Sequence, residues 1–290
     1  MRFATVGFDV GSEVAKNLLM SAQCIRRWRT TRPRTTPPIV ADSLVFREKA
    51  VGCLDLVLRA MRSVKGLDIL EVGPGDTLVS GLCFLAAGAR SYTAVDRFAG
   101  NYSGPVARSW YRKAKQLWGV EHPNLSWPNW LDPTYFPECC SKKVKVYLTP
   151  IEEETDIGSF DVVCSHDVGE HVRDIQRFAR ASMRHLRLSG VAIHGIDFGP
   201  HGPWTKYEDP HMFLYIPELL WQLMGSARGC ANRFRMSEFR AAFESVGLKV
   251  EIPESSAFDC MPNVKRLPRR LRQLEEVALM TARATFVCHH

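Results

Sequence analysis

The feature that most constrains the fold is an apolar run that starts at Leu67 and passes directly into the turn Gly73-Pro74-Gly75. An alanine- and leucine-rich segment follows the turn, and a second apolar run then ends at Asp96. This order predicts a buried strand, a tight turn, a helix and a second strand that ends in a carboxylate. Glycine carries no Cβ, so Gly73 and Gly75 allow the backbone to approach a ligand closely. Ligands of nucleotide type bind at the carboxyl ends of such strands.

Further details separate this turn from one that binds a nicotinamide cofactor. A nicotinamide-binding turn reads G-x-G-x-x-G, and Leu78 stands here in place of its third glycine. The acidic residue Glu71 precedes Gly73 by two positions, and Asp96 lies 23 residues after the same glycine. An acidic side chain at this strand end can accept hydrogen bonds from both hydroxyls of a ribose. The pattern therefore favours a nucleoside-like ligand, with a nicotinamide enzyme as the weakest alternative.

The pattern E-x-G-x-G with a later acidic strand end resembles motifs I and II of class I S-adenosylmethionine-dependent methyltransferases. Thr77 departs from that family, which usually has another glycine at this position. Residues 160–172 resemble the fourth strand of the family and the stretch after it, and residues 186–191 resemble the turn before its fifth strand. The resemblance covers roughly residues 67–252. It implies a methyltransferase that uses S-adenosylmethionine, but it does not identify the acceptor.

The resemblance also implies a set of cofactor-binding residues at the strand ends. These candidates are Glu71, Gly73, Pro74, Gly75, Asp96, Arg97, Ile151, Glu152 and His166. In this family the residues after the third strand lie near the adenine ring, where an acidic group often binds the exocyclic amine. Glu152 is the candidate for that role, and Glu153 and Glu154 compete with it.

Histidine and aspartate are dense after the expected fourth and fifth strands. The residues concerned are His166, Asp167, His194, Asp197, His201, Asp209 and His211. Methyl transfer needs alignment and exclusion of water, and it needs a base only where the nucleophile holds its proton. His166 is the first candidate for this catalytic base and His201 is the second. A metal that orients a diol and histidines that cap turns are the open alternatives. We assign no metal ligand, because His194 and Asp197 would point to opposite faces of a strand.

Other clusters have two interpretations each. The pair Glu170-His171 is expected to start a helix, in a structural or a catalytic role. Arg228, Asn232, Arg233 and Arg235 are expected in an acceptor-side cap, where they bind a carboxylate or phosphate, or in a surface turn. Four tryptophans and three tyrosines between residues 97 and 143 form a wall of an acceptor pocket or a small satellite core. These aromatic residues are Trp110, Trp118, Trp127, Trp130, Tyr102, Tyr111 and Tyr135.

Alternating strands and helices predict an α/β fold with a doubly wound, mostly parallel seven-stranded sheet and helices on both faces. We expect strands at 67–72, 91–95, 144–148, 160–165, 191–197, 248–252 and 284–288, and helices at 42–62, 78–87, 104–118, 175–186 and 236–246. Residues 1–40 are expected to form an irregular arm or linker. Residues 41–290 are expected to form the methyltransferase domain, with an insertion over about 97–143 and a cap over about 199–236.

Composition limits the class of protein further. The chain has 290 residues with 46% apolar content, which is enough for a full core, and no apolar stretch reaches the roughly 18 residues that span a bilayer. Nine cysteines without C-x-x-C pairing indicate reduced thiols and a cytoplasmic protein. The net charge of +7 is concentrated in two clusters, which bind nucleic acid or are simply solvated. The clusters are Arg26, Arg27, Arg29, Arg32 and Arg34, and Lys265, Arg266, Arg269, Arg270 and Arg272.

We therefore expect an S-adenosylmethionine-dependent methyltransferase that methylates oxygen or nitrogen of a small molecule or of a sugar in a glycan. The motif Asn-Pro-Pro-Tyr, typical of enzymes that methylate base amines, is absent from residues 165–168. Two alternatives remain: a nucleic-acid methyltransferase that uses the arginine clusters, and a non-catalytic regulator or scaffold that binds the cofactor. Oligomeric state and acceptor identity do not follow from the sequence.

Overall fold

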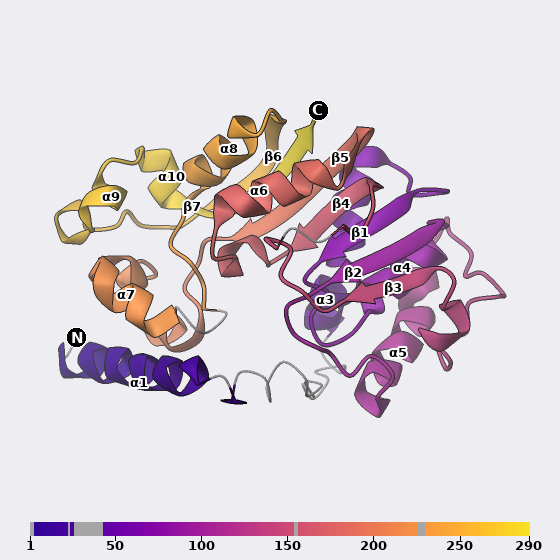
Figure 1. The fold of residues 1–290 in the computed structure, drawn as a ribbon, viewed down its shortest axis with the longest axis horizontal. Helices are drawn as coiled ribbons and strands as arrows, with labels where there is room; N and C mark the ends of the chain where they lie inside the picture. The colour runs from indigo at the N-terminus through magenta and orange to yellow at the C-terminus, as the bar shows by residue number, and fades with distance from the viewer. Residues whose placement is uncertain (1–2, 23, 26–42, 154–155, 226–229) are drawn as a thin grey trace.

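The computed structural model describes residues 3–22, 24–25, 43–153, 156–225 and 230–290. Seven strands form one sheet in the order β3-β2-β1-β4-β5-β7-β6 (Figure 1). The strands are β1 (Asp68–Val72), β2 (Ser91–Val95), β3 (Val144–Tyr147), β4 (Phe160–His166), β5 (Leu186–Asp197), β6 (Lys249–Ala257) and β7 (Thr281–His289). Strands β1 to β5 run parallel, and β7 is antiparallel to both β5 and β6. The predicted α/β sheet is confirmed.

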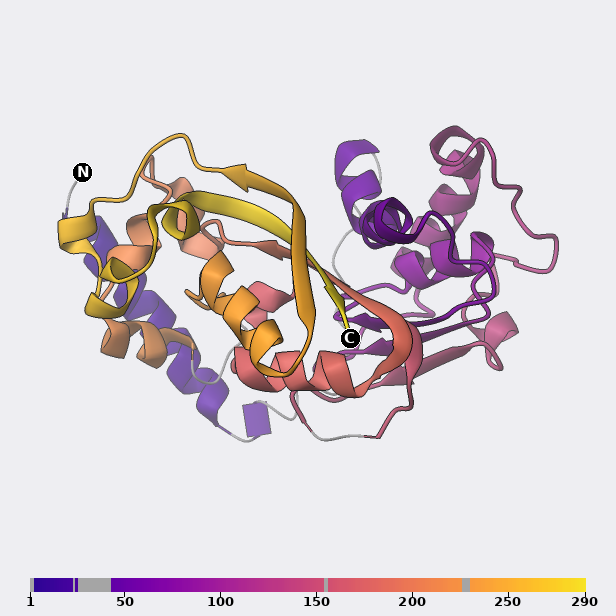
Figure 2. The same ribbon diagram turned by 90° about the horizontal axis from the view of Figure 1, so that it is seen from above.

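Helices cover both faces of the sheet, as expected for a doubly wound fold. The α-helices are α1 (Phe3–Ser21), α3 (Ser43–Met61), α4 (Val79–Ala86), α5 (Pro105–Glu121), α6 (Ile175–Arg184), α7 (Glu218–Gly225), α8 (Met236–Ser245), α9 (Arg269–Arg272) and α10 (Glu276–Met280). The 3-10 helices are η1 (Glu138–Cys140), η2 (Gly169–His171), η3 (Gly202–Lys206), η4 (Met212–Tyr215) and η5 (Val264–Arg266). Helices α3, α4 and α5 pack on one face, and α6 and α8 pack on the other (Figure 2). Helices α1, α7 and α9 lie beyond the β7–β6 side of the sheet.

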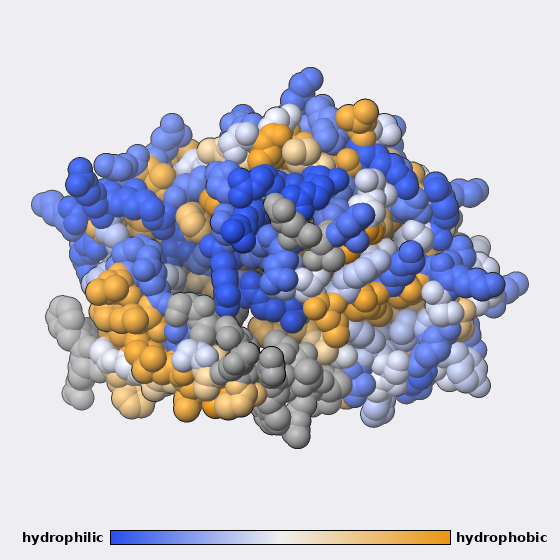
Figure 3. All heavy atoms as spheres, viewed as in Figure 1, coloured by the Kyte–Doolittle hydropathy of each residue, from blue (hydrophilic) through white to orange (hydrophobic). Residues whose placement is uncertain are grey.

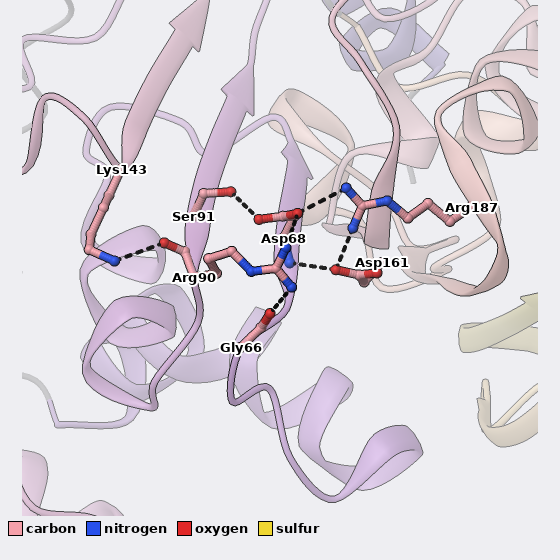
Figure 4. A network of polar contacts seen from close by, with 7 residues as sticks. All are labelled: Gly66, Asp68, Arg90, Ser91, Lys143, Asp161 and Arg187. Atoms are coloured by element: carbon pink, nitrogen blue, oxygen red, sulfur yellow. Dashed lines mark hydrogen bonds and ion pairs between the residues drawn. The ribbon is translucent and has the colours of Figure 1, made fainter.

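A polar network ties together the amino ends of the central strands (Figure 4). Asp68 accepts a hydrogen bond from Ser91 Oγ at 2.7 Å and pairs with Arg187 at 2.9 Å. Arg187 also pairs with Asp161 at 2.6 Å. Burial alone would raise the pKa of Asp68, but the Ser91 and Arg187 hydrogen bonds hold that pKa below its usual value. The network lies at the edge opposite the strand ends that carry the candidate site residues, so it fixes strand register without entering the site.

His194 is a core residue of β5. Its side chain is fully buried, its Nδ1 shares a hydrogen bond with Ser165 Oγ at 2.8 Å, and its ring stacks on Phe243 at 5.3 Å between centroids. Burial lowers the pKa of His194 to about 3. The neutral imidazole therefore contributes packing to the core, which removes His194 from the candidates for a metal ligand or base.

This burial predicts a specific loss of stability in acid. The unfolded chain protonates His194 near its usual pKa of 6.5, whereas the folded protein keeps the ring neutral. The stabilisation that comes from the neutral His194 ring is therefore fully present above pH 6.5 and is lost as the pH falls toward 3. We expect the free energy of unfolding to fall by about 2 kcal/mol between about pH 7 and about pH 5 because of this residue. Urea denaturation of wild type and His194→Phe at both pH values measures this; equal pH dependence in the two proteins would contradict it.

The aromatic insertion is a packed part of the core. Trp110, Tyr111 and Trp118 are buried and belong to the apolar cluster that α3 and α4 form on one face of the sheet. The Tyr111 hydroxyl donates to Tyr102 O at 2.9 Å and accepts from Leu78 N at 3.2 Å, so it holds the insertion against the start of α4. These residues therefore belong to the main core, and the satellite-core interpretation is wrong for them; Trp127 also packs on this cluster, while Trp130 and Tyr135 are exposed.

The N-terminal segment differs from the expectation. Residues 3–21 form helix α1, so the prediction of an irregular arm is wrong for this part of the chain. Asp9, Glu13 and Asn17 recur at helical spacing on a buried stripe, and Asn17 Nδ2 donates to Leu223 O of α7 at 2.8 Å. Val6, Val10 and Val14 pack inward beside this stripe at the same four-residue spacing, so the buried face of α1 mixes apolar and polar residues. The proline-rich stretch at 33–38, the first arginine cluster and Asp42 lie outside the described residues.

Two other element boundaries also differ from the predictions. Strand β5 begins at Leu186, so the predicted turn at 186–191 is part of the strand, with an irregular register opposite β4. The pair Glu170-His171 lies in η2 and not at the start of α6. Helix α6 is capped instead by Asp174, whose carboxylate accepts from Gln176 N and Arg177 N.

The outer faces of α1 and α7 form a largely apolar surface (Figure 3). Its exposed side chains are Phe8, Leu18, Leu19, Leu219, Leu220 and Leu223. Among the described residues, no helix combines the length and apolar character needed to cross a bilayer.

Candidate active site

A cavity of about 370 Å³ opens at the carboxyl ends of β1, β2 and β4. Parallel strands end at one edge, so residues far apart in sequence meet there. Gly73 and Asp96 lie on this cavity together with Ile151 and Val168. Met20 of α1 also lines it, so the N-terminal helix completes the wall. The volume falls within the range of ligand pockets.

The turn after β1 has the geometry that its glycines allow. Gly73 and Gly75 have φ values of +70° and +76°, in the left-handed region that favours glycine. The Asp96 carboxylate lies beside this turn: Oδ2 accepts from Gly75 N at 3.4 Å, and Oδ1 accepts from Phe98 N at 2.8 Å. Asp96 is thus oriented at the cavity by two backbone amides. Pro74 and Gly75 shape the turn but are not among the described lining residues.

Gly73 is expected to be more sensitive to substitution than Gly75. A Cβ at Gly73 would lie 2.5 Å from a methyl group of Val168, whereas a Cβ at Gly75 would meet nothing within 4 Å. Both alanine variants carry the left-handed backbone cost of about 1–2 kcal/mol, and only Gly73→Ala adds the collision. We expect urea denaturation to show the larger loss for Gly73→Ala and partial recovery in Gly73→Ala/Val168→Ala. Equal losses in the two glycine variants would contradict the contact.

Arg97, Ile151 and Glu152 line the side of the cavity nearest β3. Ile151 is buried, and Glu152 Oε1 lies 3.7 Å from an Arg97 guanidinium nitrogen. The same Glu152 oxygen accepts from Arg173 N at 3.1 Å. Glu153 accepts from the Thr149 hydroxyl instead, and Glu154 lies outside the described residues.

Glu71 lies behind the turn rather than on the cavity. It is buried, and its carboxylate accepts hydrogen bonds from the hydroxyls of Ser80 and Tyr92. Burial raises the pKa of Glu71, although these hydrogen bonds act in the opposite direction. The structure therefore gives Glu71 contacts that connect β1 to α4 and β2, and it is not one of the described residues that line the cavity.

His166 lies on a separate cavity of about 320 Å³, which α3 lines together with β5, β6 and β7. Its Nδ1 is 3.4 Å from Asp167 Oδ2, and Asp167 in turn pairs with Arg283 at 2.6 Å. Asp167 has a φ of +55° and lines the cavity at the ends of β1 and β2. Asp167 thus lies between His166 and the cofactor-side cavity. His166 is not among the described residues that line that cavity.

His201 lies on a further cavity of about 510 Å³, which adjoins the first because His171 and Cys230 line both. His201 Nε2 is 3.9 Å from Asp197 Oδ2, and the His201 and His171 rings meet edge to face at 5.2 Å between centroids. His171 of η2 and His201, which directly precedes η3, thus meet at the junction of two cavities. No group of three or more metal-ligating side chains occurs in the described part of the chain.

Glu170 is buried beside this junction. Its two carboxyl oxygens are buried and have no side-chain hydrogen-bond partner among the described residues. Burial, reinforced by the charge of Asp167, raises the pKa of Glu170 well above its usual range. The neutral carboxyl of Glu170 is therefore favoured.

The arginines before α8 stabilise the cap from inside. Arg233 donates to Ile216 O and pairs with Glu218, and Arg235 donates to Phe198 O and Thr281 O at 2.9 and 2.8 Å. Both side chains are buried, so the surface-turn interpretation is wrong for them. The terminal guanidinium nitrogens of both arginines donate to the chain itself, and neither arginine lines the cavities described above. Asn232 donates to Gly169 O and Val172 O, and Arg228 lies outside the described residues.

The sheet order and the antiparallel seventh strand decide the fold family. The chain has the class I S-adenosylmethionine-dependent methyltransferase fold. No protein-family model matches the sequence, and no curated protein matches it.

Solved structures of similar fold include several methyltransferases. A magnesium protoporphyrin IX methyltransferase from Synechocystis is 13% identical, with 95% of this chain and 98% of that chain covered and a TM-score of 0.44. An S-adenosylmethionine-dependent methyltransferase from Mesorhizobium loti is 14% identical over 81% and 96% of the chains, with a TM-score of 0.42. The YcgJ protein from Bacillus subtilis is 13% identical over 81% and 96%, with a TM-score of 0.44. The fold assignment rests on the sheet order, not on these similarities.

Several cavity residues were not predicted from the sequence. Met20 and Glu13 belong to α1, which the sequence did not indicate, and Trp204 and Trp221 lie in the predicted cap without having been singled out. The repeat of Asp9, Glu13 and Asn17 at four-residue spacing is the signal that would have revealed a polar face of α1.

Proposed function

We propose that the protein is an S-adenosylmethionine-dependent methyltransferase that methylates a hydroxyl or amine of a small molecule. The observation that carries the proposal is the position of the Asp96 carboxylate, oriented by Gly75 N and Phe98 N on a cavity at the ends of β1 and β2. The cavity also includes residues that follow β4, and the strand order reverses between β1 and β4, which is the switch point at which a doubly wound sheet binds a nucleoside.

The residues present fit the cofactor. Asp96 would accept hydrogen bonds from the ribose hydroxyls, and Gly73 lines the cavity where a Cβ would collide with Val168. Ile151 and Val72 supply apolar contacts, and Glu152 would accept from the adenine amine. Pro74 and Gly75 would shape this site, Arg97 would hold Glu152, and Glu71 and His166 would act only through neighbours.

When bound, the cofactor supplies a methyl group on a sulfonium that is already a good donor. The protein's own contribution is then to align the acceptor and to exclude water, which can account for most of the acceleration. Helix α1, through Met20, and η2, through His171, close the cavity on the cap side.

A hydroxyl acceptor also needs a base. His166 and His201 are the two candidates, and His201 is favoured because it lies on the cavity that adjoins the cofactor cavity. The Asp197 carboxylate, 3.9 Å away, would stabilise the protonated ring of His201.

Formation of S-adenosylhomocysteine from S-adenosylmethionine tests the proposal directly. A panel of small phenols, amines and sugars is compared with RNA and DNA of mixed sequence. We expect turnover with at least one small-molecule class and none with nucleic acid. Cofactor binding without turnover on any class would support the regulator interpretation instead. Salt-sensitive turnover on nucleic acid alone would favour the second arginine cluster as a binding surface.

That cluster is partly engaged within the chain. Arg270 pairs with Glu238, Arg266 stacks over the Tyr215 ring at 4.3 Å, and Arg272 Nε donates to Leu267 O at 2.6 Å. These contacts reduce the number of cations available to phosphates, which is why small-molecule acceptors are preferred in the proposal.

A further inference from the structure

The cavity of about 510 Å³ beside the cofactor cavity has no role in cofactor binding as proposed. We infer that it binds an uncharged, planar aromatic acceptor that carries a hydroxyl group, with that hydroxyl at His201. The inference rests on the proposed function, because the acceptor must lie beside the methyl donor. Its supporting observations are the aromatic walls, the way α1 fixes them, the charges of the lining and the histidines at the junction.

The walls are mostly aromatic and apolar. Trp204 of η3, Phe213 of η4 and Trp221 of α7 line the cavity together with Met224. The Trp221 ring is 6.0 Å from both the Trp204 and the Phe213 rings, measured between centroids. Rings at these separations and tilts offer both faces and edges to a planar ligand, which binds through stacked or edge-to-face contacts.

Helix α1 fixes one wall of the cavity through its buried polar stripe. Asp9 Oδ1 accepts from Lys206 Nζ at 2.8 Å, and Asp9 Oδ2 accepts from the Tyr207 hydroxyl. Asn17 donates to Leu223 O, which ties the other end of the helix to α7. These bonds connect α1 to η3 and to α7, the two elements that carry the tryptophans. The cavity is therefore preformed, and less ordering is needed when a rigid ligand binds.

The charges of the lining favour a neutral ligand. Lys16 is the one lysine or arginine among the described lining residues, and it pairs with Glu13 at 2.7 Å. Arg233, the nearest expected anion binder, donates to Ile216 O and Glu218 instead. Burying an unpaired carboxylate or phosphate among tryptophans is costly. An acceptor with a net negative charge is therefore disfavoured.

The acceptor hydroxyl would react at the junction between the two cavities. His171 lines both cavities, and His201 lies edge to face with it beside Asp197. The acceptor oxygen forms a bond to the methyl carbon as the carbon–sulfur bond breaks, and that electron pair stays on sulfur. The hydroxyl proton passes to the imidazole of His201. A hydroxyl is required at this point because it has a proton to give.

Three compounds of one carbon skeleton test the ligand class. Calorimetric titration of the full chain, saturated with S-adenosylhomocysteine, compares 2-naphthol, 2-naphthoate and decahydro-2-naphthol. We expect 2-naphthol to bind at least about tenfold more tightly than either control, and to be methylated when S-adenosylmethionine replaces the product. Tighter binding of the carboxylate, or of the saturated alcohol, would overturn the inference.

Two variants and one control locate the binding site. Trp221→Ala is expected to weaken 2-naphthol binding about tenfold, and Trp130→Ala, at an exposed position of the insertion, is expected to leave it unchanged. Ala231→Leu, which places a larger side chain on the cavity wall, is expected to exclude 2-naphthol even if Trp221→Ala fails to fold. Unchanged 2-naphthol affinity in a folded Trp221 or Ala231 variant would overturn the assignment to this cavity.

The affinity for S-adenosylhomocysteine distinguishes a failure of the proposed function from a failure of the acceptor inference. It should stay within about twofold of wild type in every variant above, since none changes a residue of the cofactor cavity. Absence of this binding in wild type would contradict the proposed function itself. Its presence without any preference for 2-naphthol would contradict only the acceptor inference.

Discussion

Asp96→Ala is expected to bind S-adenosylhomocysteine at least about tenfold more weakly than wild type. The carboxylate is held at the end of β2 by Gly75 N and Phe98 N, where two ribose hydroxyls can donate to it. Each charge-assisted hydrogen bond is worth about 1.5–3 kcal/mol, so the loss of both corresponds to more than a tenfold loss of affinity. Calorimetric titration at one ionic strength measures the change.

Two matched variants make the Asp96 result specific. Asp96→Asn keeps the size of the side chain and one acceptor oxygen but removes the charge, so an intermediate loss is expected. Asp132→Ala removes an exposed carboxylate of the insertion and should leave affinity unchanged. Wild-type affinity in a folded Asp96→Ala protein would contradict the assignment of the ribose site.

His201→Ala is expected to lower turnover on a hydroxyl acceptor by about 10²–10⁴-fold, the usual contribution of a positioned base. Cofactor affinity should change little, because His201 lines the adjoining cavity and not the cofactor cavity. Single-turnover rates with saturating cofactor measure the effect on chemistry separately from binding.

The same measurement on His166→Ala decides between the two candidate bases. His166 lies next to Asp167 on the α3 side of the sheet. If His166→Ala loses turnover, the substitution must therefore act through Asp167. A large loss in His166→Ala with full activity in His201→Ala would reverse the assignment. Equal loss of turnover and cofactor affinity in either variant would indicate a structural role.

The core of the fold and the cofactor end of the site could be predicted because their signals are local in sequence. The Gly73 turn and Asp96 lie within one strand–helix–strand unit, and the apolar strands alternate with amphipathic helices in order. Short-range patterns of this kind depend on backbone conformation and strand burial, which a single sequence records directly.

The acceptor end could not be predicted in the same way because its contacts are distant in sequence. Asp9 meets Lys206 and Tyr207 about two hundred positions later, and the valines at helical spacing beside Asp9 do not show which distant element they pack against. The prediction for Arg235 was wrong for a similar reason. An arginine before a helix is expected at the surface, but the terminal nitrogens of Arg235 donate to Phe198 O and Thr281 O. His194 looked like a site residue, and only the packing against Phe243 identifies it as core.

The central claim, that the cavity at the ends of β1 and β2 binds the methyl donor, is tested most directly by calorimetric titration of the full chain. S-adenosylmethionine and S-adenosylhomocysteine are titrated separately, with NADH as the control ligand. Our account predicts saturable binding of the first two with one site per chain and no binding of NADH. Failure of a demonstrably folded protein to bind either methyl-donor form, or preferential binding of NADH, would contradict it.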